Sequence, residues 1–438
     1  MLLAASLVFY GSFVPWYLLL LLFTTIVDYY AGHKIAQSTS PVYRKSYLVL
    51  SLTANLGLLI FFKYLNFLSG LSQLLLSLFR VHFTAPHWDI ALPIGISFFT
   101  FQSMSYTIDI YRSKIKPERS YWRFLLFVCF FTHLISGPIV RAKELLYQFD
   151  RKRKIRLKVY LEGFYLIVSG LFFKMVVADN IGDYVNKFWK YGAADNMAAA
   201  VPLSLTVLFS CQIFSDFLGY SQIAMGTAYL LGFKLPLNFN NPYIASSFRE
   251  FWTRWHITLS TWIRDYLYIP LGGNQGSQLK VFSALMITML LAGLWHGAAL
   301  TFIFWGLIHG LALVFERILR TNGFFEKKSV LIKVFWFVVV QATVLVGWIF
   351  FRSDNLGQAS RIFNNLFNGG FDPENALAIL PGLWFVIPVL ILHLRALLTE
   401  RGWIPAPRIV EKGFVGALML YGLFTLYGKT NAFLYFQF

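Results

Sequence analysis

Long runs of apolar residues, separated by short basic loops, fill most of the chain. The runs lie at 2–28, 46–62, 92–110, 159–178, 201–231, 281–295, 298–315, 331–351, 381–394 and 413–427. A helix needs about 20 residues to cross the hydrocarbon core of a bilayer. The pattern therefore predicts an all-α polytopic membrane protein with roughly ten or eleven membrane segments, not all of them complete spans. We expect a break in the first run near Pro15, and a single domain over residues 1–438.

Two basic clusters set the expected topology. One runs from Arg112 to Arg123 and the other from Arg141 to Lys158, and short basic loops remain on the cytoplasmic side of a membrane. The apolar stretch between them, Phe124 to Gly137, is too short to span. It is either a re-entrant segment covered by protein or an interfacial helix lying flat, and the sequence favours neither.

Composition excludes several classes of protein. Apolar residues make up 57% of the chain and charged residues only 13%, which is too few charges for an ordinary soluble enzyme and too much hydrophobicity for a disordered chain. The formal charge of +18 resides in short loops, so membrane topology explains it better than nucleic-acid binding. Cys129 and Cys211 both lie in apolar runs, which leaves no disulfide framework and no cysteine-based zinc site.

The segment 236–273 is unusually rich in tryptophan and arginine. Ser247 and Glu250 have the spacing of a capping box, and Pro270 ends the pattern, which predicts one helix between them. On that helix one face would carry Trp252, Trp255, Leu259, Trp262, Ile263 and Tyr266, and the other Arg254, Thr258, Thr261, Arg264 and Asp265. His256 would lie at the edge of the aromatic face. Such a helix suits the headgroup region, the wall of a cavity that binds phosphate groups, or a docking surface.

His296 lies deep in apolar sequence, between a run that begins after Lys280 and a run that ends at Glu316. If both ends are cytoplasmic, the two runs form a hairpin that carries the imidazole about 20 Å into the membrane. A titratable side chain at that depth is a functional candidate, and Gly293 and Gly297 beside it permit close approach. A buried imidazole favours its neutral form, so it could act as a general base in acyl transfer or relay protons in a transporter.

The other histidines have weaker claims. His309 is too far from His296 along a common helix to share a metal ion, and we expect it to support the site or the fold. His133 and His393 are expected to be structural. No set of Asp, Glu and His has the spacing of metal ligands, so no metal is expected.

Six stretches of the sequence resemble the membrane-bound O-acyltransferase family, in its branch of alginate, exopolysaccharide and peptidoglycan O-acetylation proteins. The stretches are LPIGISFFTFQSMSYTIDIYR (92–112), SGPIVRAKELL (136–146), FSDFLGYSQIAMGTAYLLGFKLPLNFNNPY (214–243), FREFWTRWHITLSTWIRDYLYIPLGGN (248–274), GLWHGAALTFIFWGLIHG (293–310) and FLYFQF (433–438). They place the core of the domain at 90–350. Relatives usually carry one more apolar segment before the stretch that begins here at Met1, which implies a late or misplaced start.

The resemblance implies helices around a central tunnel, with re-entrant or interfacial helices, in the bacterial inner membrane. It assigns catalysis to His296 in the Trp-His-Gly context and a second functional position to His256. Residues expected to support the site or line the tunnel are Trp295, Asp265, Trp252, Trp255, Trp262, His309 and Asn241. Arg249, Arg254 and Arg264 are candidates for contacting the phosphates of the donor.

The same resemblance implies acetyl-CoA as the cytoplasmic acyl donor, with no permanently bound cofactor. The acetyl group would reach a polysaccharide hydroxyl directly or through a periplasmic SGNH-type partner. Three alternatives remain open at this point: D-alanyl transfer to teichoic acid, a transporter or flippase of an acyl carrier, and a scaffold without chemistry of its own.

Overall fold

The computed structural model divides the chain into two compact units of helices. One unit comprises 1–160 and 227–236, and the other comprises 161–226 and 237–438. The structure describes residues 1–135, 137–150, 156–193, 197–323, 329–370, 373–429 and 434. Arg151 to Lys154 of the second basic cluster, and all of the FLYFQF tail except Leu434, lie outside these residues. The expectation of a single domain stays a prediction.

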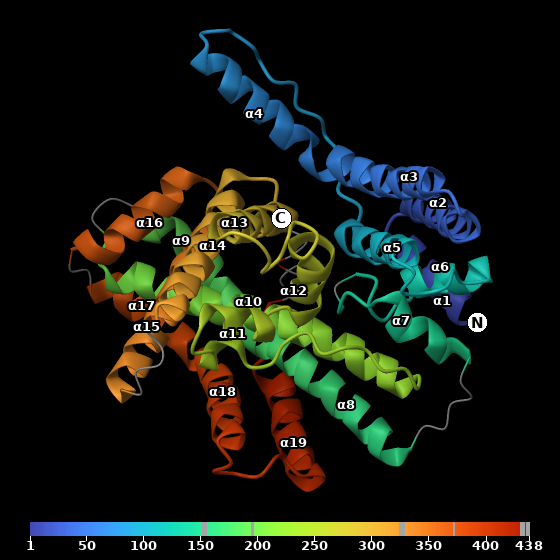
Figure 1. The fold of residues 1–438 in the computed structure, drawn as a ribbon. Coiled ribbons are helices and arrows are strands. Elements are labelled where there is room, and N and C mark those ends of the chain that lie inside the picture. The colour runs from blue at the N-terminus through green and yellow to red at the C-terminus, as the bar shows by residue number, and fades with distance from the viewer. Residues whose placement is uncertain are drawn as a thin grey trace. The chain divides into compact units, whose positions relative to one another are not determined.

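The first unit is built on three helices that pack together, α2 (Tyr17–Gln37), α3 (Pro41–Leu59) and α5 (Ile96–Tyr111). A π-helical turn η1 (Ile60–Tyr64) joins α3 to α4 (Leu65–Leu78), and Figure 1 shows this pair as one long rod that bends where the two helices join. The predicted break near Pro15 is confirmed, because α1 (Leu2–Gly11) ends before it and α2 begins after it.

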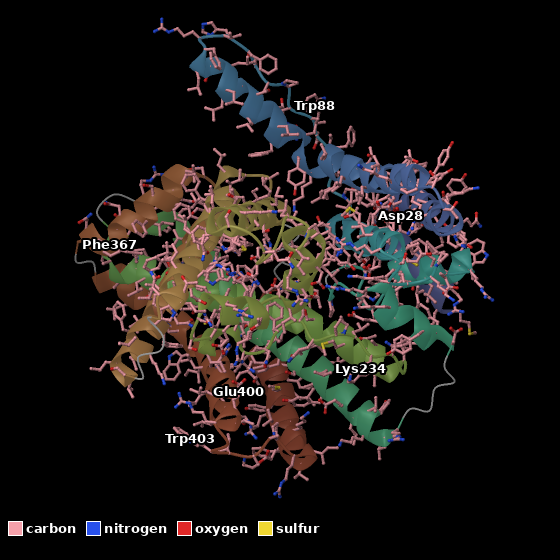
Figure 2. All side chains as sticks on the ribbon, viewed as in Figure 1. Asp28, Trp88, Lys234, Phe367, Glu400 and Trp403 are labelled. Atoms are coloured by element: carbon pink, nitrogen blue, oxygen red, sulfur yellow. The ribbon has the colours of Figure 1, made fainter. Side chains whose placement is uncertain are left out.

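A buried carboxylate joins these three helices. Asp28 of α2 accepts hydrogen bonds from Ser51 Oγ at 2.5 Å and from Asn55 Nδ2 at 2.9 Å, both on α3. Ser51 Oγ is also 2.9 Å from Thr107 Oγ1 of α5. Figure 2 labels Asp28 inside this group of helices. A buried carboxylate needs such partners, so the network fixes the register of the three helices.

The short segment between the basic clusters forms α6 (Tyr121–Cys129), followed by turns, α7 (Ala142–Leu145) and a 3₁₀ turn η2 (Leu146–Asp150). Phe124, Leu125, Phe127, Val128 and Cys129 are all fully buried. A helix lying flat at an interface would expose one face to lipid. The burial therefore favours the re-entrant interpretation.

The second unit contains the longest spans. Its elements are α8 (Leu157–Leu171, which begins in the first unit), η3 (Phe172–Ala178), α9 (Asp179–Gly192), α10 (Ala200–Leu230), η4 (Pro242–Ile244), α11 (Phe248–Arg254), α12 (Ile257–Ile263), η5 (Arg264–Tyr268), α13 (Gln278–His296), α14 (Leu300–Thr321), α15 (Val330–Arg352), α16 (Leu356–Asn368), α17 (Pro373–Leu383), η7 (Trp384–Val386), α18 (Ile387–Glu400) and α19 (Ile409–Thr425).

Buried charges in this unit are paired. Lys174 Nζ lies 2.6 Å from Asp179 Oδ1 and 2.8 Å from Asp216 Oδ1. The second carboxylate oxygen of Asp216 accepts the backbone N–H of Leu434 at 2.9 Å. The one described residue of the C-terminal tail is thus held by a buried ion cluster.

Eight helical stretches of the described chain are long and apolar enough to cross a membrane: 17–37, 41–78, 157–192, 200–230, 278–296, 300–321, 330–352 and 377–400. Three further apolar runs form the shorter helices α1, α5 and α19. The all-α, polytopic fold is confirmed. Within the described residues, both cysteines are free and buried, as their positions in apolar runs predicted.

Candidate functional site

The helical hairpin predicted around His296 is present. α13 ends at His296, Gly297 to Ala299 form the turn, and α14 returns from Leu300. His296 is only 2% exposed. The charged residues Lys280, Glu316 and Arg320 lie near the open end of the hairpin, and the imidazole lies at its closed end, as the sequence predicts.

Three glycines bring the two helices of the hairpin close enough to fix this turn. A methyl group at Gly293 would lie 2.2 Å from the Phe302 carbonyl oxygen, and one at Gly306 would lie 2.3 Å from that of Met289. At Gly297 it would lie 2.0 Å from the Phe302 ring. A larger residue at Gly293 or Gly306 requires the backbones to separate, and one at Gly297 requires the Phe302 ring to move.

Aromatic rings enclose the imidazole of His296. Its centroid lies 5.0 Å from Trp295, 5.0 Å from Trp305 and 5.3 Å from Phe351, each with the rings edge to face. Trp305 also contacts His309 at 4.9 Å and Trp252 at 5.7 Å. His309 is fully buried among these rings, and its supporting role stays a prediction.

The predicted continuous helix over 247–269 is wrong. The chain forms α11, breaks at Trp255 and His256, and continues as α12 and the π-helical turn η5. His256 adopts the left-handed conformation, with φ 41° and ψ 55°, which is uncommon for a residue with a side chain. A single helical wheel therefore does not describe which residues share a face.

The start of α11 is fixed by contacts both local and distant. Ser247 Oγ accepts the Glu250 N–H at 3.0 Å, which confirms half of the capping box. The Glu250 carboxylate instead accepts the N–H of Ser246 at 2.8 Å, one residue earlier than predicted. The buried Glu316 carboxylate of α14 accepts the Phe248 N–H, which ties α11 to the hairpin.

Asn238 explains the break at His256. Its backbone carbonyl accepts the Ile257 N–H at 2.8 Å, and its side-chain Oδ1 accepts Thr258 Oγ1 at 2.9 Å. Since this oxygen is the acceptor, the His256 Nδ1 at 3.0 Å carries the proton. Burial lowers the pKa of His256 to about 3, so the ring is neutral.

The Trp295 ring contacts both His256 and His296. The Trp295 ring lies 6.1 Å from His256 and 5.0 Å from His296. Neither His256 nor Trp295 is among the lining residues of the cavity described next, and His256 contacts the hairpin turn through the Trp295 ring.

A cavity of about 110 Å³ opens beside His296. Its walls come from α12 and η5 on one side and α13 on the other, with one residue each from α11 and α14. The lining residues are Trp252, Leu259, Ser260, Ile263, Arg264, Tyr268, Leu285, Thr288, Met289, Ala292, His296 and Leu313. The cavity is mostly apolar, with few polar groups beside the imidazole, which is typical of ligand sites.

The three candidate arginines have different surroundings. Arg264 lines the cavity, and one of its donors, Nε, is bound to Asp265 at 2.7 Å. Arg254 instead forms a bidentate salt bridge with Glu400, with both N–O distances 2.8 Å, and a further salt bridge with Glu250 at 2.8 Å. Arg249 is exposed on α11, away from the lining. Of the three, Arg264 alone is among the lining residues of the cavity, and contact with a donor stays a prediction.

The remaining predicted residues pack around the site. Trp255 lies in an aromatic core with Phe251, Phe239 and Trp348, and Trp262 packs on Tyr266 at 5.0 Å. Asn241 forms a left-handed turn before η4 and contacts Asn240. His393 packs on Phe214 and Tyr243, consistent with a structural role.

Several residues at the site were not singled out from the sequence: Asn238, Ser260, Tyr268, Thr288, Trp305 and Phe351. Asn238, Ser260, Tyr268 and Trp305 lie in the matched stretches, and Trp305 shares the stretch of His296, whereas Thr288 and Phe351 lie outside them. Asn238 is one of three asparagines in LNFNN, and nothing in the sequence separates it from its neighbours.

Comparison with known proteins agrees with this geometry. The family model of the membrane-bound O-acyltransferases matches residues 116–325, which include α11 to α14. The probable alginate O-acetylase AlgI of Pseudomonas aeruginosa is 39% identical over 372 residues, covering 84% of this chain and 70% of that protein. The peptidoglycan O-acetyltransferase of Helicobacter pylori is 34% identical over 388 residues, covering 83% and 72%.

A second branch of relatives is more distant. The teichoic acid D-alanyltransferase of Bacillus subtilis is 28% identical over 229 residues, covering 50% of this chain and 57% of that protein. The family of the chain follows from the extent and identity of the match to the two O-acetylation proteins, together with the helical membrane fold. The chain belongs to the membrane-bound O-acyltransferase family and is a multi-pass membrane O-acyltransferase.

Proposed function

We propose that the protein moves an acetyl group from cytoplasmic acetyl-CoA across the bacterial inner membrane for O-acetylation of a cell-surface polysaccharide. The observation that carries the proposal is the buried imidazole of His296 in the wall of a small cavity that Arg264 also lines. The cavity volume suits a short acyl group and not a long fatty acyl chain.

In this proposal His296 is the general base. The imidazole takes the proton of an acceptor hydroxyl while that oxygen attacks the thioester carbonyl. The C–S bond then breaks, the ester forms, and the thiolate leaves with the proton as the free thiol of CoA. Arg264, at the cavity wall, contacts a phosphate of the donor. His256 holds the α11–α12 break and Trp295, and it is a positioning residue.

The acceptor hydroxyl belongs to the polysaccharide or to a periplasmic SGNH-type partner that completes the transfer. The relatives support a glycan acceptor. Of those named above, the two with the most extensive match are named for O-acetylation of alginate and of peptidoglycan. The D-alanyl branch matches only half of this chain, so acetyl is favoured over D-alanyl. No permanently bound cofactor or metal enters the proposal.

The test offers two labelled donors to the protein in sealed vesicles that hold the partner and glycan inside. With acetyl-CoA outside, we expect label on the enclosed glycan, and with a D-alanyl carrier protein we expect none. Arg264→Gln should raise KM for acetyl-CoA about tenfold, as expected for one lost charged contact, with kcat little changed. Arg249→Gln, at an exposed position outside the cavity, is the matched control.

Two outcomes would contradict the proposal. Label from the D-alanyl carrier alone would assign the protein to the teichoic-acid branch. Passage of intact donor into the vesicles without cleavage of its thioester would make the protein a transporter.

A further inference from the structure

A second pocket lies in the second unit, and it shares no lining residue with the cavity beside His296. Its lining comes from the first two turns of α15, the C-terminal end of α18 and the loop around η4 that leads into α11. The residues are Ile244, Ser246, Val330, Ile332, Lys333, Val334, Trp336, Phe337, Leu397 and Arg401, and the volume is about 710 Å³. This size falls within the range of ordinary ligand pockets.

Most of the lining is apolar and belongs to membrane-spanning helices. α15 and the stretch 377–400 are both candidate spans. Val330, Val334 and Phe337 are exposed on α15, whereas Trp336 is buried and packs on Phe248 at 5.8 Å. If the pocket opens to the lipid phase between these two spans, hydrocarbon chains are the natural occupant of its apolar part.

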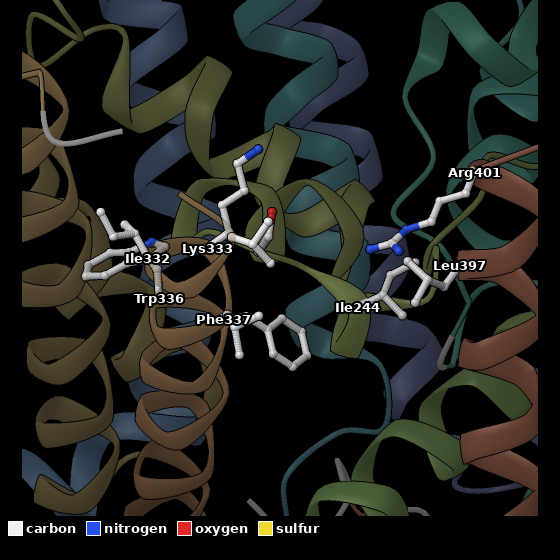
Figure 3. A pocket seen from close by; sticks show the side chains of 10 residues that line it. Ile244, Ile332, Lys333, Trp336, Phe337, Leu397 and Arg401 are labelled. Carbon is white, nitrogen blue, oxygen red and sulfur yellow. The ribbon is translucent and has the colours of Figure 1, made fainter. Parts of the chain in front are cut away.

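The polar part of the pocket is positive. Lys333 and Arg401 are its charged lining residues, and among the residues that the structure describes (324–328, just before α15, are not among them) no Asp or Glu lines it. Figure 3 shows the Arg401 guanidinium over the side chains of Ile244 and Leu397, and Lys333 on the opposite side of the pocket with its amine directed away from Phe337. The neighbouring Glu400 does not neutralise them, because its carboxylate is bound at both oxygens by Arg254. This end of the unit also carries Arg317 and Arg320, which places it on the cytoplasmic side by the loop-charge rule.

We propose that this pocket binds an anionic phospholipid, with the headgroup phosphate between Lys333 and Arg401 and an acyl chain along Ile332, Phe337 and Leu397. Basic pockets between spanning helices on the cytoplasmic side have the chemistry for such headgroups. The apolar lining selects a lipid over a soluble phosphate, which would leave these side chains in contact with water.

The test measures retained lipid on the full-length protein. The wild type and Lys333→Gln/Arg401→Gln are reconstituted in nanodiscs of phosphatidylglycerol and phosphatidylcholine, extracted mildly and analysed by native mass spectrometry. We expect the wild type to retain phosphatidylglycerol in preference to phosphatidylcholine. Loss of two charges should weaken this retention about thirty-fold, about fivefold for each.

Three comparisons keep the result interpretable. Lys333→Arg/Arg401→Lys preserves both charges and should retain the lipid, and Lys280→Gln removes an exposed cation at the start of α13 and should leave retention unchanged. Inorganic phosphate at millimolar concentration should not displace the lipid. Equal retention in the wild type and the double glutamine variant, displacement by phosphate, or a second copy of the chain in place of lipid would each overturn the proposal.

Discussion

At the scale of single residues, the site depends on how the protein holds two buried histidines differently. His296 lines a cavity and is held by the edges and faces of aromatic rings. His256 is held by a hydrogen bond to Asn238 in a left-handed backbone conformation. The first can meet a ligand in the cavity, and the second fixes the chain beside it. In the proposed mechanism, the first is therefore the base and the second the positioning residue.

The buried neutral His256 predicts acid sensitivity. Its folded pKa is about 3, against the ordinary value of 6.5, so the unfolded chain binds a proton between these values and the folded protein does not. Its contribution to stability is complete above pH 6.5 and decreases as the pH falls toward 3. Lowering the pH from 7 to 5 should therefore decrease the free energy of unfolding by about 2 kcal/mol through His256. His256→Asn, which tolerates the left-handed backbone, should show a smaller decrease in Tm over this range.

His87→Asn is the control for this measurement, because His87 is exposed in the loop after α4. Its Tm should follow the wild type at every pH. Parallel pH profiles for the wild type and His256→Asn would show that His256 already titrates in the folded protein as it does in the unfolded chain.

At the scale of elements, the α13–α14 hairpin is the part that places His296 beside the cavity. Gly293 and Gly306 let the two backbones touch, so a methyl group at either position would displace the turn at His296. We predict that Gly306→Ala destabilises the protein by about 1–3 kcal/mol and lowers acyl transfer. Gly413→Ala in α19 meets nothing within 4 Å and should be neutral or slightly stabilising. Thermal unfolding and the rate of acyl transfer, measured on both variants, test this prediction. Unchanged transfer by a folded Gly306→Ala protein would contradict the role of the glycine contact.

The hairpin and the break in the α11–α12 segment show how far sequence reasoning reaches. The hairpin could be predicted because apolar length, charged ends and glycines are all local signals. The break could not, because its cause is Asn238, which binds Ile257 and Thr258 from outside the segment. A left-handed histidine also has no periodic signature. The sequence could not distinguish Arg254 from Arg264, because Glu400, which pairs with Arg254, is far along the chain.

At the scale of the whole molecule, the eight long apolar helices and the basic loops imply a fixed orientation in the membrane. The rod of α3 and α4 should carry the chain from the cytoplasmic side to a loop on the opposite side that contains His87, and α5 should return it to the first basic cluster. The re-entrant α6 then leads to the second cluster. The prediction is that a membrane-impermeant maleimide labels His87→Cys only from outside the cell and Lys158→Cys only in inside-out vesicles. The native cysteines are buried and should give little background. Labelling of both positions from one side would contradict this orientation.

The central claim is that the His296 imidazole accepts a proton during ester formation, and transfer of labelled acetyl from acetyl-CoA by His296→Ala protein in vesicles tests it most directly. Loss of a general base predicts a decrease of about a hundredfold or more, with unchanged abundance in the membrane. The matched control is His393→Gln, which replaces another buried histidine outside the cavity and should transfer at the wild-type rate. Transfer by His296→Ala at the wild-type rate would contradict the account.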